Sequence, residues 1–373
     1  MAIEGELVVR IATADGRVMR AQASAERPRV AGALFRGRRA AEAPVLAGAL
    51  FAICGRSQAI AAAAAVETAR GEPAGAAMQA ARAARMAAEN VHEHAWRLLV
   101  DWPRLAGREP EVAALAAARE ALAPLLAAEA GADLRDAVAN TRDWAAWAVF
   151  GSSAEEFLAL AGVPALEAWA KAAATPVATL ATAMLASHAS LGACDVALLP
   201  EGDASWIARE IAPALDREAG FDEAPHWHGE ARETGPLVRT AAHPLVADAV
   251  ATWGRGVGAR LVARLVDLAA TLVALGAAAR DGHGAVALAS GGAIAWVETT
   301  RGLLVHRVAL DGERIADYRI VAPTEWNFHP EGALARGALG LAAGDGARLE
   351  RELRWLIASL DPCVGVRFEA GHA

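Results

Sequence analysis

The chain has 373 residues and a formal charge of −8; 55% of its residues are hydrophobic, but only 5% are aromatic. This length suffices for two ordinary domains or one large domain, and the heavy use of alanine favours closely packed helices over a strand-rich sandwich. A nucleic-acid-binding surface is excluded, because it needs a net basic face and the sequence has no basic stripe with interleaved aromatic residues.

The cysteines and the N-terminal segment indicate a reducing compartment. Cys54, Cys194 and Cys363 are widely separated, which does not fit a disulfide framework. The opening MAIEGELVVRI lacks the basic and then apolar pattern of a signal peptide. The charge-free run 172–194 contains a proline and many small residues, so a buried or interfacial helix pair is favoured over a membrane span. We therefore expect a cytoplasmic protein that does not enter a membrane.

The first third of the chain predicts a β-hairpin followed by two helices. Apolar and polar residues alternate over 6–26 on both sides of Asp15-Gly16, a dipeptide that suits a two-residue hairpin turn. Alanine and leucine then recur at helical spacing over 44–70 and 78–102. Glycine and proline between these two ranges separate the helices.

The remainder predicts more helices and one group of strands. The segment FGSSAEEFLALAG carries a capping box, in which a serine stands three residues before a glutamate. Further helices are expected over 164–174, 177–187 and 244–280. Between 285 and 322, short apolar runs alternate with Gly-Gly and Asp-Gly turns, which indicates an antiparallel strand meander. A final helix covers 346–360.

The domain organisation follows from what is missing between these elements. No internal repeat and no long low-complexity linker divides the sequence. Residues 1–373 are therefore expected to form a single α+β domain, mainly helical, with peripheral antiparallel β ribbons.

Five stretches of sequence, in order along nearly the whole chain, carry a family resemblance. They are AIEGEL, LFRGRRAAEAPVLAGALFAICG, VHEHAWRLLVDW, ETGPLVRT and a closing group formed by VETTRGLLVH, VAPTEWN and DPC. Each is similar to a motif of the large subunit of nickel–iron hydrogenases, and the motifs follow the same order in that family. The resemblance implies a hydrogenase large-subunit-like helical core.

The resemblance also shows where the metal ligands differ. The family holds nickel and iron with two C-x-x-C pairs, whose second cysteines bridge the two metals. Cys54 and Cys363 match the first cysteine of each pair, whereas Ser57 and Val366 stand in the bridging positions. Neither serine nor valine replaces a soft thiolate. We therefore expect Cys54 and Cys363 as the remaining metal ligands, and a protein that is not an enzyme.

The lining of the family's metal pocket is better preserved than its ligands. Glu4 matches a proton-relay glutamate, Arg301 an arginine above the open coordination position, and Asp361 the ion partner of that arginine. Pro323 and Thr324 match the pocket that takes the cyanide ligands of the iron. An arginine keeps its charge and presents fixed N–H donors, so this lining would attract an anionic iron dicyanide carbonyl fragment.

Preserved lining together with lost bridging thiolates resembles the HupK-type hydrogenase expression/formation proteins. This resemblance implies a cytoplasmic accessory role in maturation, as a scaffold or a transient carrier of the iron dicyanide carbonyl fragment or of nickel. The implied partners are the hydrogenase large subunit precursor and HypC-type maturation chaperones. Only Ala370 to Ala373 follow Glu369, so we expect no C-terminal processing step of the kind that the family's catalytic subunits undergo.

Each candidate residue also has a plainer interpretation. Cys54 and Cys363 would then be small buried hydrophobic residues, Arg301 and Asp361 an interior ion pair, and Glu4 a surface ion-pair partner of the hairpin. For the whole protein, the alternatives are a divergent nickel–iron hydrogenase with its own metal site and a metal-free interaction protein.

Other residues of metal-binding type carry weaker signals. His92 and His94 are two residues apart and therefore point from different faces of a helix. His226 and His228 would share one face of an extended segment, but no third ligand is evident. Cys194 lies in none of the motifs and is expected to be structural.

Overall fold

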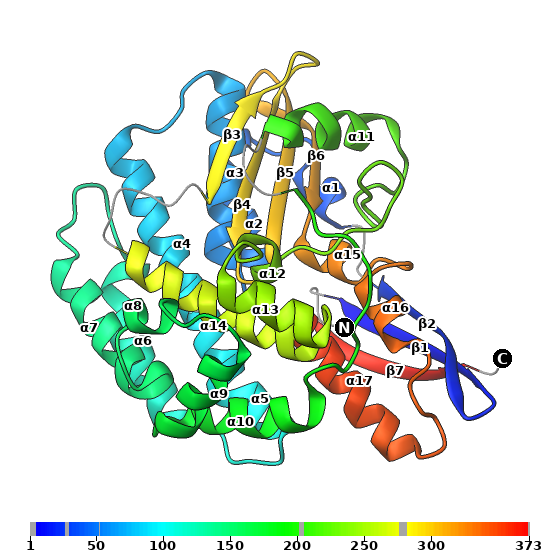
Figure 1. The fold of residues 1–373 in the computed structure, drawn as a ribbon. Coiled ribbons are helices and arrows are strands. Elements are labelled where there is room, and N and C mark those ends of the chain that lie inside the picture. Colours follow the sequence, from blue (N-terminus) through cyan, green and yellow to red (C-terminus); the bar gives the residue numbers. More distant parts are fainter. Residues whose placement is uncertain (1–4, 27–29, 52, 201–204, 276–281, 372–373) are drawn as a thin grey trace.

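The computed structural model describes residues 5–26, 30–51, 53–200, 205–275 and 282–371. Figure 1 shows a four-stranded sheet with α3 beside it, a long helix α14 running beneath the sheet, further helices below α14, and a small separate sheet next to α17. Among the helices so described, none combines the length and the apolar character that a membrane span requires.

The helices account for most of the architecture. In chain order they are α1 Val30–Phe35, α2 Ala43–Leu50, α3 Gly55–Arg70, α4 Ala76–Trp96, α5 Trp102–Leu105, α6 Val112–Leu126, α7 Arg135–Ala145, α8 Ala154–Leu158, α9 Val163–Ala172, α10 Pro176–His188, α11 Ala212–Arg217, α12 Pro236–Arg239, α13 Pro244–Trp253, α14 Val257–Ala274, α15 Pro323–Asn327, α16 Ala333–Ala338 and α17 Gly346–Leu360. The strands are β1 Glu6–Ala14, β2 Arg17–Glu26, β3 His283–Ala287, β4 Ala293–Thr299, β5 Gly302–Asp311, β6 Arg314–Val321 and β7 Gly365–Gly371.

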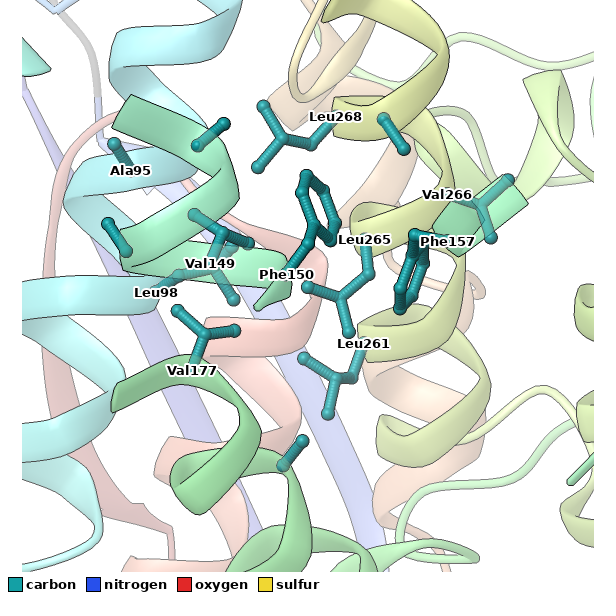
Figure 2. Packing of buried hydrophobic residues seen from close by; sticks show 14 of the residues in the cluster. Ala95, Leu98, Val149, Phe150, Phe157, Val177, Leu261, Leu265, Val266 and Leu268 are labelled. Atoms are coloured by element: carbon teal, nitrogen blue, oxygen red, sulfur yellow. The ribbon is translucent and has the colours of Figure 1, made fainter. Parts of the chain in front are cut away.

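Helix α14 is the centre of the largest hydrophobic cluster. From Val257 to Ala269 every one of its residues is buried, because helices from both halves of the chain surround it. Figure 2 shows Leu261 and Leu265 of α14 packed beside Phe150 and Phe157. Burying one such side chain contributes about 1.5–3 kcal/mol, so this contact region supplies a large part of the folding free energy.

The four-stranded sheet has the order β3-β4-β5-β6 and is antiparallel throughout. Its residues alternate between two covered faces. Ala293 and Ala295 of β4 pack in the cluster that contains α3, whereas Ile294 between them packs with Ile207 and Leu215 near α11. Because the two central strands are covered on both faces, most of β4 and the first part of β5 are buried and their sequences are largely apolar.

The smaller sheet joins the two ends of the chain. Its order is β2-β1-β7, with β2 antiparallel and β7 parallel to β1. Val366 of β7 lies opposite Leu7 of β1 and packs against the cluster formed by the hairpin and α17. The sequence did not predict β7, because its partner β1 lies at the opposite end of the chain and no local turn signal links the two strands.

Several predicted elements are confirmed. The hairpin turns at Asp15 and Gly16, both with positive φ as a two-residue turn of this kind requires. The meander and the final helix lie where the pattern placed them. Ser153 and Glu156 form the predicted capping box at the start of α8, each side chain bonded to the backbone N–H of the other.

The helix predicted over 44–70 is wrong as a single element. The chain leaves α2 after Leu50, turns, and begins α3 at Gly55. The turn depends on two glycines whose backbones touch, since a Cβ atom on Gly55 would lie 2.6 Å from the carbonyl oxygen of Gly48. This break places Cys54 at the end of a turn instead of inside a helix.

The helix predicted over 244–280 is also divided. It consists of α13 and α14, separated at Gly254, where φ is 71° and ψ is −179°. A Cβ atom on Gly254 would lie 2.9 Å from the side chain of Ala193. The helix ends at Ala274, and residues 276–281 lie outside the described ranges.

Candidate functional site

Segments that are distant in sequence meet at one place between α3, α15 and α17. Cys54 directly precedes α3, Cys363 follows α17, and Arg301 lies between β4 and β5. The two thiols and the guanidinium are close enough for the charge of each to act on the others. The hydroxyl of Thr324 lies 3.2 Å from the sulfur of Cys363. The structure therefore brings four of the expected site residues together.

Cys54 is buried, and its environment keeps it protonated when no metal is bound. Burial raises the pKa of the Cys54 thiol to about 12; the charge of Cys363 adds to this increase, and Arg301 opposes it. The amide of Gln58 donates a hydrogen bond to the Cys54 sulfur at 3.8 Å. Such a donor favours a negatively charged or metal-bound sulfur over a neutral thiol.

A chain of hydrogen bonds leads from this sulfur into the sheet. His306 Nε2 lies 2.8 Å from the Gln58 carbonyl oxygen, and His306 Nδ1 lies 2.7 Å from the hydroxyl of Tyr318. Burial lowers the pKa of His306 to about 3, so the ring is neutral and each of its nitrogens has a single role. Tyr318 therefore donates to His306, His306 to Gln58, and Gln58 to Cys54.

Arg301 is a buried cation with one donor group to spare. Its Nη2 donates to Glu93 at 2.9 Å, and its Nε lies 3.4 Å from Asp361. Burial lowers the pKa of Arg301, but the charges of Asp361 and Glu93 outweigh burial and raise it above its usual value. Its Nη1 has no hydrogen-bond partner among the described residues. The guanidinium can therefore donate to a further acceptor without breaking an existing bond.

Asp361 fixes the arrangement by pairing with three arginines. It ends α17 in a left-handed conformation with φ 58°, which turns the chain sharply toward Cys363. Its carboxylate lies 2.6 Å from Arg97 and 2.9 Å from Arg264, in addition to Arg301. Burial raises the pKa of Asp361, but the three guanidiniums together hold it far below its ordinary range.

A π-helical turn brings Arg97 into this group. The turn spans Arg97–Asp101 and joins α4 to α5 without interrupting the helix. Its extra residue changes the direction in which the following side chains point, and such turns are frequent at functional sites. Arg97 also pairs with Asp101 and donates to the carbonyl of Pro362 at 2.9 Å. The segment that carries Cys363 is therefore held by side chain and backbone together.

Ser57 and Val366, which the sequence comparison matched to bridging cysteines, make other contacts in the structure. The Ser57 hydroxyl donates to Glu89 at 2.5 Å, and the backbone N–H groups of Arg56 and Ser57 donate to the same carboxylate at 2.9 Å. Burial raises the pKa of Glu89, and these hydrogen bonds reduce the increase. Val366 is taken up in the pairing of β7 with β1. Both side chains are therefore committed to the fold.

A cleft with a volume of about 490 Å³ reaches the site, and Arg301 forms part of its wall. We call it the arginine cleft. Its lining comes from the start of α3, from α4 and the turn that follows, from α6 and from Arg301. The residues are Ile53, Arg56, Glu89, His92, Glu93, Trp96, Arg97, Arg119, Leu126 and Arg301.

The remaining predicted residues are placed as follows. Pro323 is the first residue of α15 and is buried next to Thr324, whereas Glu4 lies outside the described ranges. His92 contacts Glu93, while His94 is buried 3.0 Å from Asp267. No group of three or more His, Cys, Asp or Glu side chains suited to a metal ion occurs among the described residues.

The other histidines and the third cysteine serve local structure. His226 lies 2.8 Å from Glu218, and His228 packs against the ring of Trp227. Cys194 lies 3.9 Å from the carbonyl oxygen of Ala333, in the cluster beneath the hairpin.

Sequence reasoning missed Gln58, Glu89, Glu93, Arg97 and His306. A signal existed for Glu89 and Glu93, which are four residues apart and therefore share one face of α4. Two acidic residues on a helix face that carries so much alanine suggest an interior partner. Gln58 and Arg97 each have one partner four residues away, Cys54 and Asp101, but their contacts with His306 and Asp361, and both contacts of His306, come from distant parts of the chain and leave no local signal.

Comparison with known proteins places these observations in a family context. No protein-family model matches the chain. The hydrogenase expression/formation protein HoxV of Cupriavidus necator is 35% identical to it, over 98% of this chain and 95% of its own length. The hydrogenase expression/formation protein HupK of Rhizobium leguminosarum bv. viciae is 30% identical, over 86% of this chain and 84% of its own length.

Solved hydrogenases share the fold. The as-isolated oxidized Ni-Fe-Se hydrogenase of D. vulgaris Hildenborough superposes with a TM-score of 0.63 at 14% identity, covering 96% of each chain. The reduced, active Ni-Fe-Se hydrogenase of Desulfomicrobium baculatum gives a TM-score of 0.58 at 15% identity, covering 95% of each chain. The chain therefore has a hydrogenase large-subunit-like fold, as its motifs predicted. At these identities the likeness concerns the fold alone.

Proposed function

Because the chain belongs to the family of HoxV and HupK hydrogenase expression/formation proteins, we propose that it is a non-catalytic protein that transiently holds an iron dicyanide carbonyl fragment. The accessory role in hydrogenase maturation comes with the family. The cargo and the manner of holding it are the new elements of the proposal, and they rest on the arrangement around Cys54 and Cys363.

One observation carries the proposal: two thiols lie beside a buried guanidinium that has an unused donor. Cys54 and Cys363 supply two soft ligands, which suits a thiophilic metal that brings its remaining ligands with it. Arg301 Nη1 is buried and has no hydrogen-bond partner among the described residues. A cyanide ligand is a negatively charged acceptor of the kind that this donor requires.

The surroundings of the sulfurs support binding of an anionic fragment. The Thr324 hydroxyl is within hydrogen-bond distance of Cys363, and Gln58 donates to Cys54. Hydrogen bonds of this type orient metal-bound thiolates and adjust the electron density on sulfur. Burial raises the pKa of the bare Cys54 thiol, so binding of the metal fragment to its sulfur would displace a proton.

The same geometry argues against catalysis. A nickel–iron centre needs two further sulfurs shared by both metals, and the corresponding positions are Ser57 and Val366. Ser57 is bonded to Glu89, and Val366 lies in the small sheet. A site with two thiolates holds one metal weakly enough for transfer, whereas four thiolates would hold a finished centre.

The iron fragment is favoured over nickel because of the residues around the thiols. Cys54 and Cys363 match cysteines that bind nickel in the large subunits of nickel–iron hydrogenases. Arg301, Pro323 and Thr324 match the pocket that holds the cyanide ligands of the iron in those subunits. A transient site needs directional contacts to the cargo more than a complete ligand set. The partners that fit this role are the hydrogenase large subunit precursor and HypC-type maturation chaperones, which would receive and deliver the fragment.

The proposal is tested by infrared spectroscopy of protein purified anaerobically from a host that has its own hydrogenase maturation machinery. We expect cyanide and carbonyl stretching bands together with bound iron. Both should be lost in Cys54→Ala and in Cys363→Ala and retained in Cys194→Ala, the matched control in which the third thiol is removed from the cluster beneath the hairpin.

Two outcomes would contradict the proposal. Protein with neither iron nor bands that still binds hydrogenase precursor would be a metal-free scaffold. Bands that persist in both Cys54→Ala and Cys363→Ala would place the fragment elsewhere on the chain.

A further inference from the structure

The arginine cleft has a charge opposite to that of the protein as a whole. The chain carries a formal charge of −8, yet four arginines and two glutamates line the cleft. Both glutamates are already engaged: Glu89 accepts hydrogen bonds from the backbone at the start of α3, and Glu93 accepts one from Arg301. Arg97 and Arg301 are engaged as well, with Asp361 and with Asp101 or Glu93. The charges left for an incoming ligand are those of Arg56 and Arg119, so the surface available for binding is cationic.

Two of the arginines are placed to receive a ligand. The Arg56 side chain is exposed and makes no ion pair with any of the residues described. Arg119 donates to His92 at 3.3 Å and lies over the ring of Trp96, 5.4 Å from its centre. This stacking holds the guanidinium of Arg119 in place before a ligand arrives, so less side-chain entropy is lost on binding.

The cleft also offers apolar surface between its charges. Ile53 is 37% exposed, and Trp96 and Leu126 are part of the lining. A volume of about 490 Å³ lies in the range of sites that take a small ligand or a few side chains. A small inorganic anion would neutralise the arginines but would leave these apolar groups in water.

We propose that the arginine cleft binds an acidic, partly apolar peptide segment of the partner that delivers or receives the cargo. Carboxylates of the segment pair with Arg56 and Arg119, and its apolar side chains cover Ile53 and Trp96. The identity of the partner rests on the proposed function, but the peptide chemistry rests on the cleft alone.

The position of the cleft gives this binding a consequence for the cargo site. Ile53 and Arg56 flank Cys54 in the sequence, and Arg301 is shared between the cleft and the cargo site. A segment seated in the cleft therefore covers the approach to the buried thiol. Docking of the partner would exclude water from the site while the cargo passes between the two proteins.

The test measures binding of a fluorescein-labelled octapeptide of alternating glutamate and leucine to the purified, cargo-free full chain by fluorescence anisotropy. The peptide should bind saturably, and added salt should weaken binding. The octapeptide with lysine in place of glutamate should not bind. The double variant Arg56→Glu, Arg119→Glu should bind the acidic peptide at least about tenfold more weakly, because both rim charges are reversed.

Arg351→Glu is the matched control, since Arg351 is an exposed arginine on a helix remote in sequence from the cleft lining. This variant should bind the acidic peptide with an affinity within about twofold of that of the unmodified chain. The proposal is overturned if the acidic peptide does not bind saturably, or if the double variant binds it as well as the control. Displacement of the peptide by inorganic phosphate at equal concentration would also overturn it, because the site would then recognise an anion only.

Peptide binding and cargo binding can fail separately. Cys54→Ala should bind the peptide like the unmodified chain, because the thiol does not line the cleft. A protein that binds the peptide but never shows cyanide or carbonyl bands would contradict the proposed cargo. The same result would still support the arginine cleft as a peptide-binding site.

Discussion

Asp361 is a buried carboxylate that pairs with three arginines. It is only 2% exposed and faces Arg97, Arg264 and Arg301. One carboxylate among three cations is stable because Arg97 and Arg301 have second partners, Asp101 and Glu93. Removing the charge of Asp361 would leave guanidiniums facing one another in an interior that cannot solvate them.

Asp361→Asn should therefore lower the free energy of unfolding by about 3–5 kcal/mol, as is typical when one partner of a buried ion pair is lost. Urea denaturation followed by circular dichroism measures the change. Asp195→Asn is the control, since Asp195 pairs with Arg336 while 84% exposed, and it should change stability by no more than about 0.5 kcal/mol. A loss below about 1 kcal/mol for Asp361→Asn would show that the three arginines do not depend on it.

At the residue scale the resemblance identified more than the pattern of the sequence did. Comparison with hydrogenase motifs named Cys54, Cys363, Arg301 and Thr324, which the structure places near one another. No periodicity shows that Gln58 bonds to His306, because this contact joins a helix to a strand about 250 residues away in sequence. Hydrogen-bond partners from distant elements become visible only in the fold.

At the element scale, α14 and α4 contribute a group of buried polar residues inside the helical core, which we call the polar spine: Arg260, Arg264 and Asp267 of α14 and His94 of α4. Arg260, Arg264 and Asp267 lie three or four residues apart on α14 and are buried. Arg264 reaches both Asp361 and His94, and Asp267 accepts from Arg239 and contacts His94. Helix α14 therefore lies at the centre of the apolar cluster and also positions the buried charged groups that contact the candidate site.

This spine makes stability depend on pH through His94. Burial lowers the pKa of His94 to about 4 from an ordinary value of 6.5. The unfolded chain therefore binds more protons than the folded chain between these values, and stability falls as pH falls from 6.5 to 4. The contribution is at most about 3 kcal/mol.

The measurement compares urea unfolding of the unmodified chain and of His94→Gln at several pH values. Glutamine keeps a donor and an acceptor at this position but does not titrate, so the variant should lose less stability on acidification. Equal slopes for the two proteins between pH 6.5 and 4 would show that His94 is not responsible.

Strand β7 limits which side chains can be introduced near the candidate site. Because Val366 is paired opposite Leu7 and packs against the cluster of the hairpin and α17, a cysteine there replaces a partly buried apolar side chain. Likewise, a cysteine at position 57 enters the hydrogen bonds around Glu89. We therefore expect that cysteines at both positions do not complete a four-sulfur site.

The variant Ser57→Cys, Val366→Cys should therefore not oxidise dihydrogen, even when produced with the complete maturation machinery. Hydrogen-dependent reduction of a viologen dye measures this activity, and circular dichroism verifies that the variant is folded. Turnover above that of the unmodified chain would contradict this prediction. It would show that the residue types at positions 57 and 366, and not the position of β7, prevent oxidation of dihydrogen.

The sequence predicted elements well where the signal was local and failed where it was not. The hairpin turn, the capping box at α8 and the meander follow from residues next to one another. The break before Cys54 depends on contact between Gly48 and Gly55 across a turn. Alanine on both sides of that break has the same helical spacing, so composition concealed the break that places Cys54 at the start of α3.

At the scale of the whole molecule, the chain has the fold of a hydrogenase large subunit, while Ser57 and Val366, which the sequence matched to bridging cysteines, make other contacts. The structural likeness covers 96% of the chain at 14% identity, so the architecture has been retained although most residues have changed. The polar groups around Arg301 remain connected to the core through Asp361 and α14. We infer that the fold presents a partial site from which cargo can be released, next to a cationic cleft where a partner can dock.

Transfer of the cargo tests this account most directly. The chain is purified anaerobically with its iron fragment, incubated with cargo-free hydrogenase large subunit precursor, and separated again before infrared spectra of both proteins are recorded. The account predicts that the cyanide and carbonyl bands leave this chain and appear on the precursor. Bands that stay on the chain, or oxidation of dihydrogen by the chain alone, would contradict it.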